Sequence, residues 1–577
     1  MKTLSLKAYG EIWLVDFEFR SPPGEPPEVV CLVAREYHTK QQVRLVASEM
    51  AALEEPPYGL GDDCLFVAYC ASAEFSCHLA LGWALPTQVL DLFAEFRVAT
   101  NTTEGHPPAY LLDALKHFGI NHSTDSVEKE LMCDLIMTGE PYSDKDQKQI
   151  LDYCESNVVA LELLLPRLMD EGNWPQALLR GRYMKAVTQI ERNGTPVEAG
   201  LLSQTLESWP DIRSHLIALV DTDFGVYEGT TFKKAAFSHY LMKEGIAWPQ
   251  LPSGGLDLKE GTFADMAKIH PQIGPLHSLR SSLSKLRTAA PTIGTDERNR
   301  FSLVPFRSRT GRNQPSSREA LFGYSAWMRG FMKATPGFAL VYIDWSQQEF
   351  GIAAALSGDQ AMMTAYASGD PYLEFARQAG SVPPEATKQS HPDERALFKE
   401  CVLAVQYGMG AASLAKRIDQ PESKAAHLLS LHRRTYGRFW EWSEGVLDYA
   451  LLEGKLKTTF GWPIQIGAKP NKRSIQNFLM QANGAEMLRL ACIFATEAEI
   501  KVCAPVHDAV LIEASLDSLE ATITAMQEHM AEASRIVLNG FELRSDAECF
   551  PYPQRYADPR GQTMWDTVMT LVNREAA

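Results

Sequence analysis

Residues 338–349 read FALVYIDWSQQE, and this stretch decides the fold. Five of its first six residues are apolar, and Val341 and Ile343 are β-branched, which predicts a buried strand. The apolar run ends at Asp344, and a second carboxylate, Glu349, follows five residues later. A buried strand that ends on a carboxylate is well placed to present that group to a metal ion or a substrate.

A second strand-like segment carries another carboxylate. Residues 501–514, KVCAPVHDAVLIEA, contain two apolar runs on either side of His507 and Asp508, which predicts a hairpin with these two residues at its tip. Two carboxylates at adjacent strand ends, here Asp344 and Asp508, are what two-metal catalysis needs, with ions about 3.5–4 Å apart. The alternative is that the two aspartates belong to unrelated surface turns.

A predicted helix adds cationic and aromatic groups. In residues 395–410, RALFKECVLAVQYGMG, a four-residue spacing places one set of side chains on a single helix stripe: Arg395, Lys399, Leu403 and Tyr407. Arg and Lys suit a triphosphate, and Tyr407 followed by Gly408 suits a flat base stacked close to the backbone. The alternative is a solvated Arg/Lys pair on an amphipathic helix.

Composition limits the class of protein. The chain has 577 residues, which is too many for one hydrophobic core. No apolar run has membrane-spanning length, and no secretion signal is expected at the N-terminus. Ten scattered cysteines without a CxxC pair favour unpaired thiols in a reducing cytoplasm. The net charge is −17, but residues 298–318 hold six arginines and no acid, which predicts a local phosphate-binding patch.

The coarse pattern indicates an α/β multidomain protein. Residues 11–19, EIWLVDFEF, alternate like a half-buried strand. Mixed strands and helices follow to about residue 170 and end in a long amphipathic helix at 144–172. The segments 175–290 and 352–455 are predicted to be mostly helical.

These segments resemble those of family A DNA polymerases, the group that includes bacterial DNA polymerase I and related phage replicases. DWSQQE (344–349) resembles the first palm motif, RALFKECVLAVQYG the fingers helix R-x₃-K-x₆–₇-YG, and VHDAV (506–510) the third motif, HDE. TGRNQPS (310–316) and RSIQNFLMQANGAEM (473–487) are similar to two further family segments. The resemblance covers most of 300–515 in the family's order.

The resemblance implies the chemistry of the site. Asp344 and Asp508, helped by the carbonyl of Trp345, would bind two Mg²⁺ ions, or Mn²⁺. Arg395 and Lys399 would bind the triphosphate of a dNTP, and Lys399 would also be a candidate general acid for pyrophosphate departure.

It also implies how nucleotide and DNA are held. The nucleotide site would include Gln347, Leu403 and Tyr407, with Tyr407 beside the nascent base pair. Primer–template DNA would be contacted near the primer 3′ end by Arg312, Arg473, Asn477, Gln481 and His507.

Glu349 would be the sugar gate, since its side chain would fill the space that a ribose 2′-hydroxyl needs. The alternative is a helix N-terminal carboxylate favoured by the helix dipole.

Two positions depart from the family pattern. Leu403 replaces the usual Phe or Tyr of the sugar pocket, which affects discrimination against dideoxynucleotides. Ala509 replaces the usual Glu, and we expect activity to survive with altered metal use.

The N-terminal segment predicts a second site. Asp16 and Glu18 lie on the same side of a strand and could bind one metal, or they could be two exposed acids. Together with Glu74, Tyr153 and Asn157 they resemble, in order, the DEDD-type 3′–5′ exonuclease that precedes the polymerase in this family.

Three positions of this second site differ from the family pattern. Cys70 stands where Asn is usual, Glu74 replaces Asp, and Asn157 replaces the last metal-binding Asp. Asn supplies an oxygen but no charge, so we expect a folded but severely weakened exonuclease.

The resulting domain assignment has five parts: an RNase H-like exonuclease domain (1–170), thumb and connecting helices (171–290), palm (291–351), fingers (352–470) and the second part of the palm (471–577). The last four form a right-hand polymerase.

The expected partners are primer–template DNA and dNTPs, bound by a cytoplasmic monomer. No 5′-nuclease domain is expected, which favours a phage or plasmid replicase over a repair enzyme. The alternatives are a single-subunit RNA polymerase and a non-catalytic DNA-binding scaffold.

Overall fold

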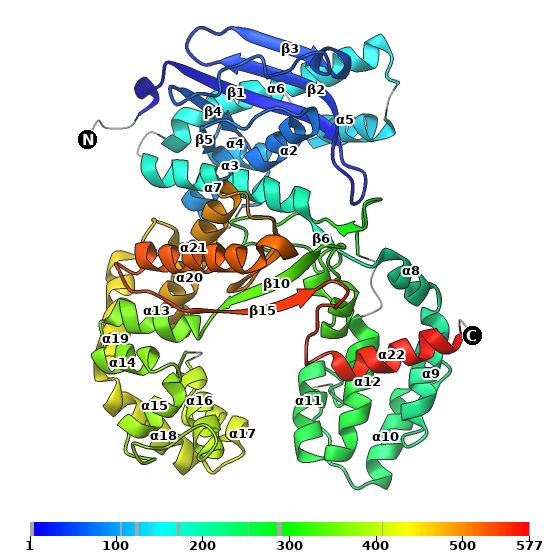
Figure 1. Cartoon of the computed structure of the whole chain (residues 1–577), viewed down its shortest axis with the longest axis vertical. Coiled ribbons are helices and arrows are strands. Elements are labelled where there is room, and N and C mark those ends of the chain that lie inside the picture. The colour runs from blue at the N-terminus through cyan, green and yellow to red at the C-terminus, as the bar shows by residue number, and fades with distance from the viewer. Residues whose placement is uncertain are drawn as a thin grey trace. The chain divides into compact units, whose positions relative to one another are not determined.

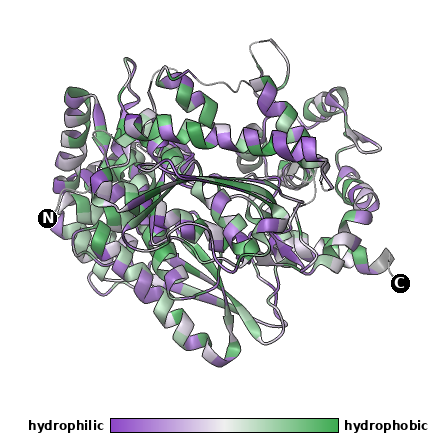
Figure 2. Cartoon of the chain, turned by 90° about the horizontal axis from the view of Figure 1, so that it is seen from above, coloured by the Kyte–Doolittle hydropathy of each residue, from purple (hydrophilic) through white to green (hydrophobic). Residues whose placement is uncertain are grey.

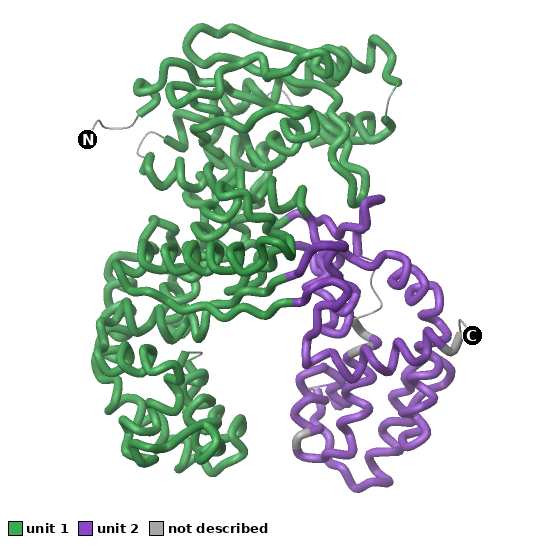
Figure 3. The backbone as a smooth tube through the Cα atoms, viewed as in Figure 1, with its two compact units in different colours: residues 1–193, 303–314, 341–549 green, residues 194–302, 315–340, 550–577 purple. Residues whose placement is uncertain are grey.

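The computed structural model describes residues 5–103, 107–121, 126–139, 141–169, 173–251, 253–285, 291–406 and 408–575. The chain divides into two compact units, which Figure 3 colours separately. Unit 1 contains residues 1–193, 303–314 and 341–549, and unit 2 contains residues 194–302, 315–340 and 550–577. No helix in the described ranges is long and apolar enough to cross a membrane.

The N-terminal part of unit 1 is built on a five-stranded sheet. Its strands are β1 (Glu11–Arg20), β2 (Glu28–Glu36), β3 (Gln42–Val46), β4 (Cys64–Ala68) and β5 (Gln88–Asp91), in the order β3-β2-β1-β4-β5. The strand predicted at 11–19 is confirmed as β1, which lies in the centre, antiparallel to β2 and parallel to β4. Ile12 and Leu14 of β1 are fully buried in the core of this sheet.

Helices accompany this sheet. They are α1 (Ala47–Met50), α2 (Ala71–Leu81), α3 (Leu92–Thr100), α4 (Leu111–His117), α5 (Ser126–Thr138), α6 (Asp144–Met169) and α7 (Trp174–Asn193), and a short 3₁₀ turn at Leu6–Ala8 precedes β1. The long helix predicted at 144–172 is confirmed as α6, whose apolar face, including Ile150, Val158 and Leu161, packs into the same core.

The second sheet of the chain has four strands. They are β10 (Phe338–Trp345), β13 (Val502–Val506), β14 (Ala509–Ser515) and β15 (Ser545–Pro551), in the order β13-β14-β10-β15. The predicted hairpin is confirmed, because β13 and β14 pair antiparallel around His507 and Asp508. The strand predicted to end on Asp344 continues one residue further, to Trp345. Figure 1 shows β10 and β15 side by side, with α20 (Lys472–Glu497) and α21 (Leu519–Val537) alongside the sheet.

The helical region predicted at 352–455 is confirmed and begins slightly earlier. It contains α13 (Gln348–Ser357), α14 (Gln360–Ala367), α15 (Pro371–Gln378), α16 (Pro392–Gln406), α17 (Ala411–Ile418), α18 (Glu422–Thr435) and α19 (Gly437–Glu453). A small hairpin of β11 (Lys455–Lys457) and β12 (Pro463–Gln465) leads to α20, and the 3₁₀ turn Leu516–Ser518 separates β14 from α21. Many helices carry hydrophobic and hydrophilic residues on different sides, as Figure 2 shows.

Unit 2 is mainly helical and has its own core. Its helices are α8 (Ala199–Glu207), α9 (Trp209–Asp221), α10 (Lys234–Lys243), α11 (Glu260–Ile269), α12 (Gly274–Lys285) and α22 (Gln562–Glu575). Short strand pairs are β6 (Thr195–Pro196) with β9 (Arg298–Asn299) and β7 (Tyr227–Glu228) with β8 (Thr231–Phe232); 3₁₀ turns lie at Pro271–Ile273, Leu321–Gly323 and Ala326–Phe331. The core is aromatic, with Phe237 packed against Trp248 and Phe263.

Two members of the arginine-rich stretch, Arg298 and Arg300, are engaged by other residues of the fold. Arg298 is 7% exposed and donates a hydrogen bond to the carbonyl of Gly194 (3.1 Å). Arg300 forms an ion pair with Asp296. These two arginines stabilise the β6/β9 region instead of presenting free charges.

Candidate active site

Asp344 and Asp508 come together at the centre of the four-stranded sheet. Asp344 lies on β10 next to the strand end, and Asp508 occupies the tip of the β13/β14 hairpin. The backbone N–H of Trp345 donates a hydrogen bond to the carbonyl of Asp508 (3.3 Å), which joins the two segments. His507 adopts a left-handed conformation with φ +57°, an uncommon backbone geometry for a residue other than glycine. The predicted meeting of the two aspartates is thus a feature of the fold.

The two carboxylates are partly buried and repel nearby charge. Burial first, and then the charges of Asp508 and Asp546, raise the pKa of Asp344 to about 7. Burial also raises the pKa of Asp508, while the charges of Arg312 and His507 lower it. Oδ1 of Asp344 is buried and has no hydrogen-bond partner in the described part of the chain. A cation would remove both the repulsion and the missing interaction.

This donor set fits Mg²⁺. Mg²⁺ is commonly held in enzymes by one or two carboxylates, completed by water and substrate phosphates. No group of three or more His, Cys, Asp and Glu side chains in the described ranges forms a complete protein cage for a metal. Asp344 and Asp508 would supply the two carboxylates, and Trp345, whose side chain is 1% exposed, would contribute its backbone carbonyl.

Glu349 lies beside the aspartates in the first turn of α13. Gln347 caps this helix with φ +48°, and its side-chain oxygen is buried without a hydrogen-bond partner in the described residues. Burial raises the pKa of Glu349, the charge of Arg312 lowers it and that of Asp508 raises it. The predicted sugar-gate residue is therefore within electrostatic reach of a predicted metal ligand.

Helix α16 presents its two cations on one face, as the spacing predicts. The Arg395 guanidinium lies 5.6 Å and the Lys399 ammonium 6.0 Å from the ring centre of Tyr372. Arg395 also forms an ion pair with Asp370, at the N-terminus of α15. Leu403 is half-buried on the same helix. The prediction for Tyr407 lies outside the described residues.

The residues expected to touch DNA fall into two groups. Arg473, Asn477 and Gln481 occur at four-residue intervals on α20, which places them on one side of that helix. The aliphatic part of Arg473 lies so close to Gly408 that a Cβ there would sit 2.9 Å from its Cγ. Arg312 and His507 act electrostatically on Asp508 and so lie near that carboxylate.

The N-terminal acids also come together, but an amide lies between them. The side-chain NH₂ of Asn157 donates hydrogen bonds to Oδ2 of Asp16 (3.2 Å) and to Oε1 of Glu18 (3.1 Å). Glu74 is 4% exposed and accepts a hydrogen bond from the backbone N–H of Phe17 (2.8 Å). Tyr153 is buried close to Glu18 and Asn157, and burial raises the pKa of its hydroxyl.

Burial shifts the titration of these N-terminal acids. Burial raises the pKa of Asp16, and hydrogen bonds from Asn157 and Cys154 lower it. The net result is a pKa of about 7. Burial also raises the pKa of Glu18 and Glu74, and the neighbouring carboxylates raise them further. The five predicted residues thus form one group. In it, the Asn157 NH₂ donates hydrogen bonds to Asp16 and Glu18, where a metal ligand would present an oxygen lone pair.

Several neighbours of the polymerase-like site were not predicted. Asp546 on β15 influences Asp344 electrostatically and accepts a hydrogen bond from the Ser346 hydroxyl. Tyr366 donates to the Ser346 carbonyl (3.0 Å) and accepts from the Arg544 backbone N–H (3.0 Å). Asp546 and Tyr366 lie outside the recognised motifs, and only the packing of β15 and α14 next to Ser346 reveals their proximity.

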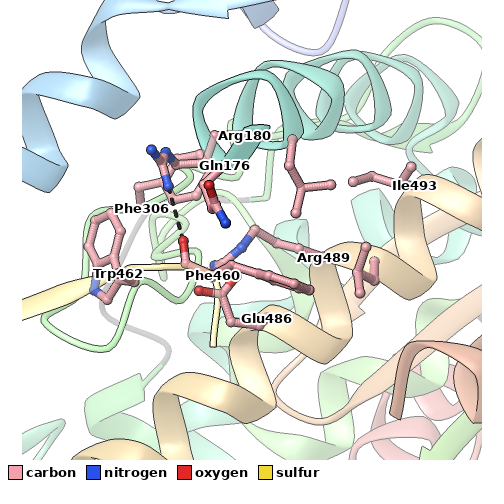
Figure 4. Close-up of a pocket in the computed structure, with 10 residues that line it drawn as sticks. Gln176, Arg180, Phe306, Phe460, Trp462, Glu486, Arg489 and Ile493 are labelled. Carbon is pink, nitrogen blue, oxygen red and sulfur yellow. Dashed lines mark hydrogen bonds and ion pairs between the residues drawn. The ribbon is translucent and has the colours of Figure 1, made fainter. Parts of the chain in front are cut away.

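A small buried cavity marks a different feature of unit 1. It has a volume of about 10 Å³ and is lined by side chains that include Arg180, Glu486 and Arg489, as Figure 4 shows. Arg180 pairs with Glu95 (2.7 Å), and Arg489 pairs with Glu486 (2.6 Å). The cavity is too small for a substrate. Its charged lining is paired, which indicates a structural role.

Comparisons with known proteins agree with the polymerase-like site. The profile of DNA polymerase family A matches residues 315–546. The thermostable DNA polymerase I of Thermus thermophilus is 25% identical over 46% of this chain and 31% of its own length, so the chain spans less than a third of that relative. DNA polymerase I of Aquifex aeolicus is 21% identical over 74% of this chain and 80% of its own length.

A solved structure supports the fold over nearly the whole chain. The POL domain of Pol1 from M. smegmatis, in complex with DNA primer-template and dNTP, aligns with a TM-score of 0.69 at 15% identity. The alignment covers 96% of each chain. The profile match to residues 315–546, the sequence relatives and this shared fold together support a family A DNA polymerase.

Proposed function

We propose that this protein is a template-directed DNA polymerase that adds dNTPs to a primer 3′-hydroxyl. The observation that carries the proposal is the meeting of Asp344 and Asp508, joined through the hydrogen bond from Trp345. The solved relative, whose title names primer-template DNA and dNTP, supports the assignment of the same partners to this chain.

The chain's own residues would divide the work. Asp344 and Asp508 would hold two Mg²⁺ ions, which supply activation of the attacking oxygen and neutralisation of the phosphate charge. Arg395 and Lys399 would bind the triphosphate, with Lys399 also donating a proton to the departing pyrophosphate. Because Arg395 is held by Asp370, the incoming triphosphate would have to compete with this ion pair.

Glu349 would select deoxyribose. Its position in the first turn of α13, within reach of Arg312 and Asp508, supports a role next to the sugar of the incoming nucleotide. A single-subunit RNA polymerase must accept ribonucleotides. Glu349 argues against that alternative, because a ribose 2′-hydroxyl would meet its carboxylate.

For the N-terminal region we propose an RNase H-like exonuclease domain that is severely weakened. Its sheet and the grouping of Asp16, Glu18 and Glu74 support the domain type. The amide of Asn157 supports the loss of activity, since an NH₂ group that donates to Asp16 and Glu18 opposes a cation at the same place. Thumb, palm and fingers are proposed for 171–290, for 291–351 with 471–577, and for 352–470.

A primer-extension assay tests the polymerase proposal. A 5′-labelled primer on a longer template is incubated with Mg²⁺, with and without the four dNTPs. The proposal requires extension with dNTPs by the natural sequence, no extension by Asp508→Ala, and an intact primer without dNTPs. Absence of extension by a folded natural protein would favour the scaffold alternative.

A second assay offers ribonucleotides in place of dNTPs. If Glu349→Ala incorporates no more ribonucleotides than the natural sequence, Glu349 is not the sugar gate.

A further inference from the structure

The strand β15 places a third carboxylate directly across from Asp344. The backbone N–H of Ser346 on β10 donates to the carbonyl of Arg544 (2.9 Å). Counting two residues back from Ser346 and two residues forward from Arg544 brings Asp344 opposite Asp546. The hydrogen bond from the Tyr552 N–H to the Phe338 carbonyl (3.0 Å), at the other end of the two strands, has the same antiparallel register.

Directly opposed residues of an antiparallel pair project from the same face of the sheet, with Cβ atoms about 4.5–5.5 Å apart. Asp546 is also close enough to Asp344 to act on it electrostatically. Two like charges in this arrangement destabilise a sheet. The repulsion between the carboxylates of Asp344 and Asp546 has a functional explanation if a hydrated cation lies between them.

The side chain of Asp546 is positioned for such a contact. One oxygen, Oδ2, accepts a hydrogen bond from the Ser346 hydroxyl, which restrains the carboxylate. The carboxylate of Asp546 is exposed, and Oδ1 of Asp344 is buried without a hydrogen-bond partner among the described residues. The residue after Asp508 is Ala509, which is fully buried and offers no carboxylate from the hairpin side. An additional carboxylate for a metal ion near Asp344 can therefore come from β15, through Asp546.

We infer that Asp546 is an outer carboxylate of the metal site, which holds a water of the divalent cation that Asp344 and Asp508 bind. This role agrees with the absence of a three-ligand protein cage among the described residues. This inference rests on the proposed two-metal function, which it extends by one residue that no motif contains. Asp546 is exposed and reachable by solvent and ions, unlike Glu486 and Glu513, which are buried and form ion pairs with Arg489 and Lys501.

Mn²⁺ binding to the full chain without DNA tests this inference, followed by the electron paramagnetic resonance signal of free Mn²⁺. We expect Asp546→Asn to raise the Mn²⁺ dissociation constant about tenfold and Asp546→Glu to restore part of the affinity. Glu548→Gln is the matched control, because it removes a charge from the same exposed strand two residues away. The control should remain within twofold of the natural protein.

Asp344→Asn separates the possible failures. If Asp344→Asn weakens Mn²⁺ binding and Asp546→Asn does not, the inference about Asp546 is wrong while the two-metal site stands. If neither substitution changes the affinity, the proposed metal site itself is wrong. Thermal unfolding in EDTA checks folding, and Asp546→Asn should unfold at the same or a higher temperature, since it removes a repulsion.

Discussion

At the scale of single residues, the site depends on carboxylates that the fold brings together from distant parts of the chain. Asp344, Asp508 and Glu349 come together as expected because each lies at or next to the end of an element that the sequence pattern predicts. Asp546 could not be predicted, since its strand, SDAECFP, has no clear apolar alternation and lies 202 residues from Asp344 along the chain (546 − 344). Pairing between distant strands decides such contacts, and one sequence does not encode it in local form.

The raised pKa of Asp344 predicts a pH-dependent stability. Its folded-state pKa of about 7 lies above the ordinary value of 3.8, so between these values the folded protein binds more protons than the unfolded chain. The free energy of unfolding should therefore fall as pH rises from about 4 to about 7. Urea unfolding in EDTA at pH 5 and pH 8 measures this. Asp344→Asn should show a smaller decrease, and an unchanged decrease would contradict the assignment.

Asn157→Asp should restore 3′–5′ digestion. The substitution replaces an amide that donates to Asp16 and Glu18 by a carboxylate that can bind Mg²⁺. We expect at least a ~100-fold gain in the rate of primer shortening without dNTPs, equivalent to about 2.7 kcal/mol. The substitution should also lower the unfolding temperature in EDTA, because it adds a half-buried negative charge next to Asp16 and Glu18. Robust digestion by the natural sequence, lost in Asp16→Ala, would refute this account.

At the scale of elements, periodicity predicted most helices and strands but not their neighbours. The stripe of α16 is confirmed for Arg395 and Lys399, which both lie over Tyr372. Neither Tyr372 nor Asp370 was predicted, because they come from α15 and meet α16 only through packing. The phosphate-binding patch at 298–318 stays a prediction, although the carbonyl of Gly194, distant in the sequence, engages one of its six arginines, Arg298.

Loss of the Arg395 guanidinium should weaken nucleotide binding more than loss of a solvated lysine. A charge-assisted hydrogen bond contributes about 1.5–3 kcal/mol, so Arg395→Ala should raise the dNTP dissociation constant roughly 10- to 100-fold. Single-turnover incorporation at varied dNTP concentration gives this constant. Lys416→Ala, on the exposed side of α17, is the control and should change it less than twofold. Equal effects of the two substitutions would argue against a triphosphate site on α16.

At the scale of the whole molecule, the sequence predicted several domains but assigned them as continuous segments, apart from the palm. The structure has two units that the chain enters more than once, so segments such as 303–314 belong with residues far from them in sequence. Helix α7 illustrates the difference. It packs in unit 1, whereas the predicted boundary at residue 171 grouped it with the thumb helices.

The two arginines of α7 should differ sharply in their effect on stability. Arg180 and Glu95 form a buried ion pair, with side chains 9% and 6% exposed, while Arg182 and Glu497 pair at the surface. Arg180→Ala leaves a buried charge without its partner and should reduce the free energy of unfolding by about 3–5 kcal/mol. Arg182→Ala should cost less than about 1 kcal/mol. Urea unfolding followed by circular dichroism measures both free energies of unfolding. If the two substitutions reduce them by similar amounts, the structural role of the Arg180–Glu95 pair is contradicted.

The central claim is that Asp344 and Asp508 hold the metal ions of a DNA polymerase, and single-nucleotide incorporation under pre-steady-state conditions tests it most directly. The natural protein, Asp344→Asn, Asp508→Asn and the exposed control Asp517→Asn are compared on one primer–template with Mg²⁺. We predict about a 10³-fold or greater loss of rate for each of the first two variants and no loss for the control. Rates within tenfold of the natural protein for both site variants would show that these carboxylates do not carry the reaction.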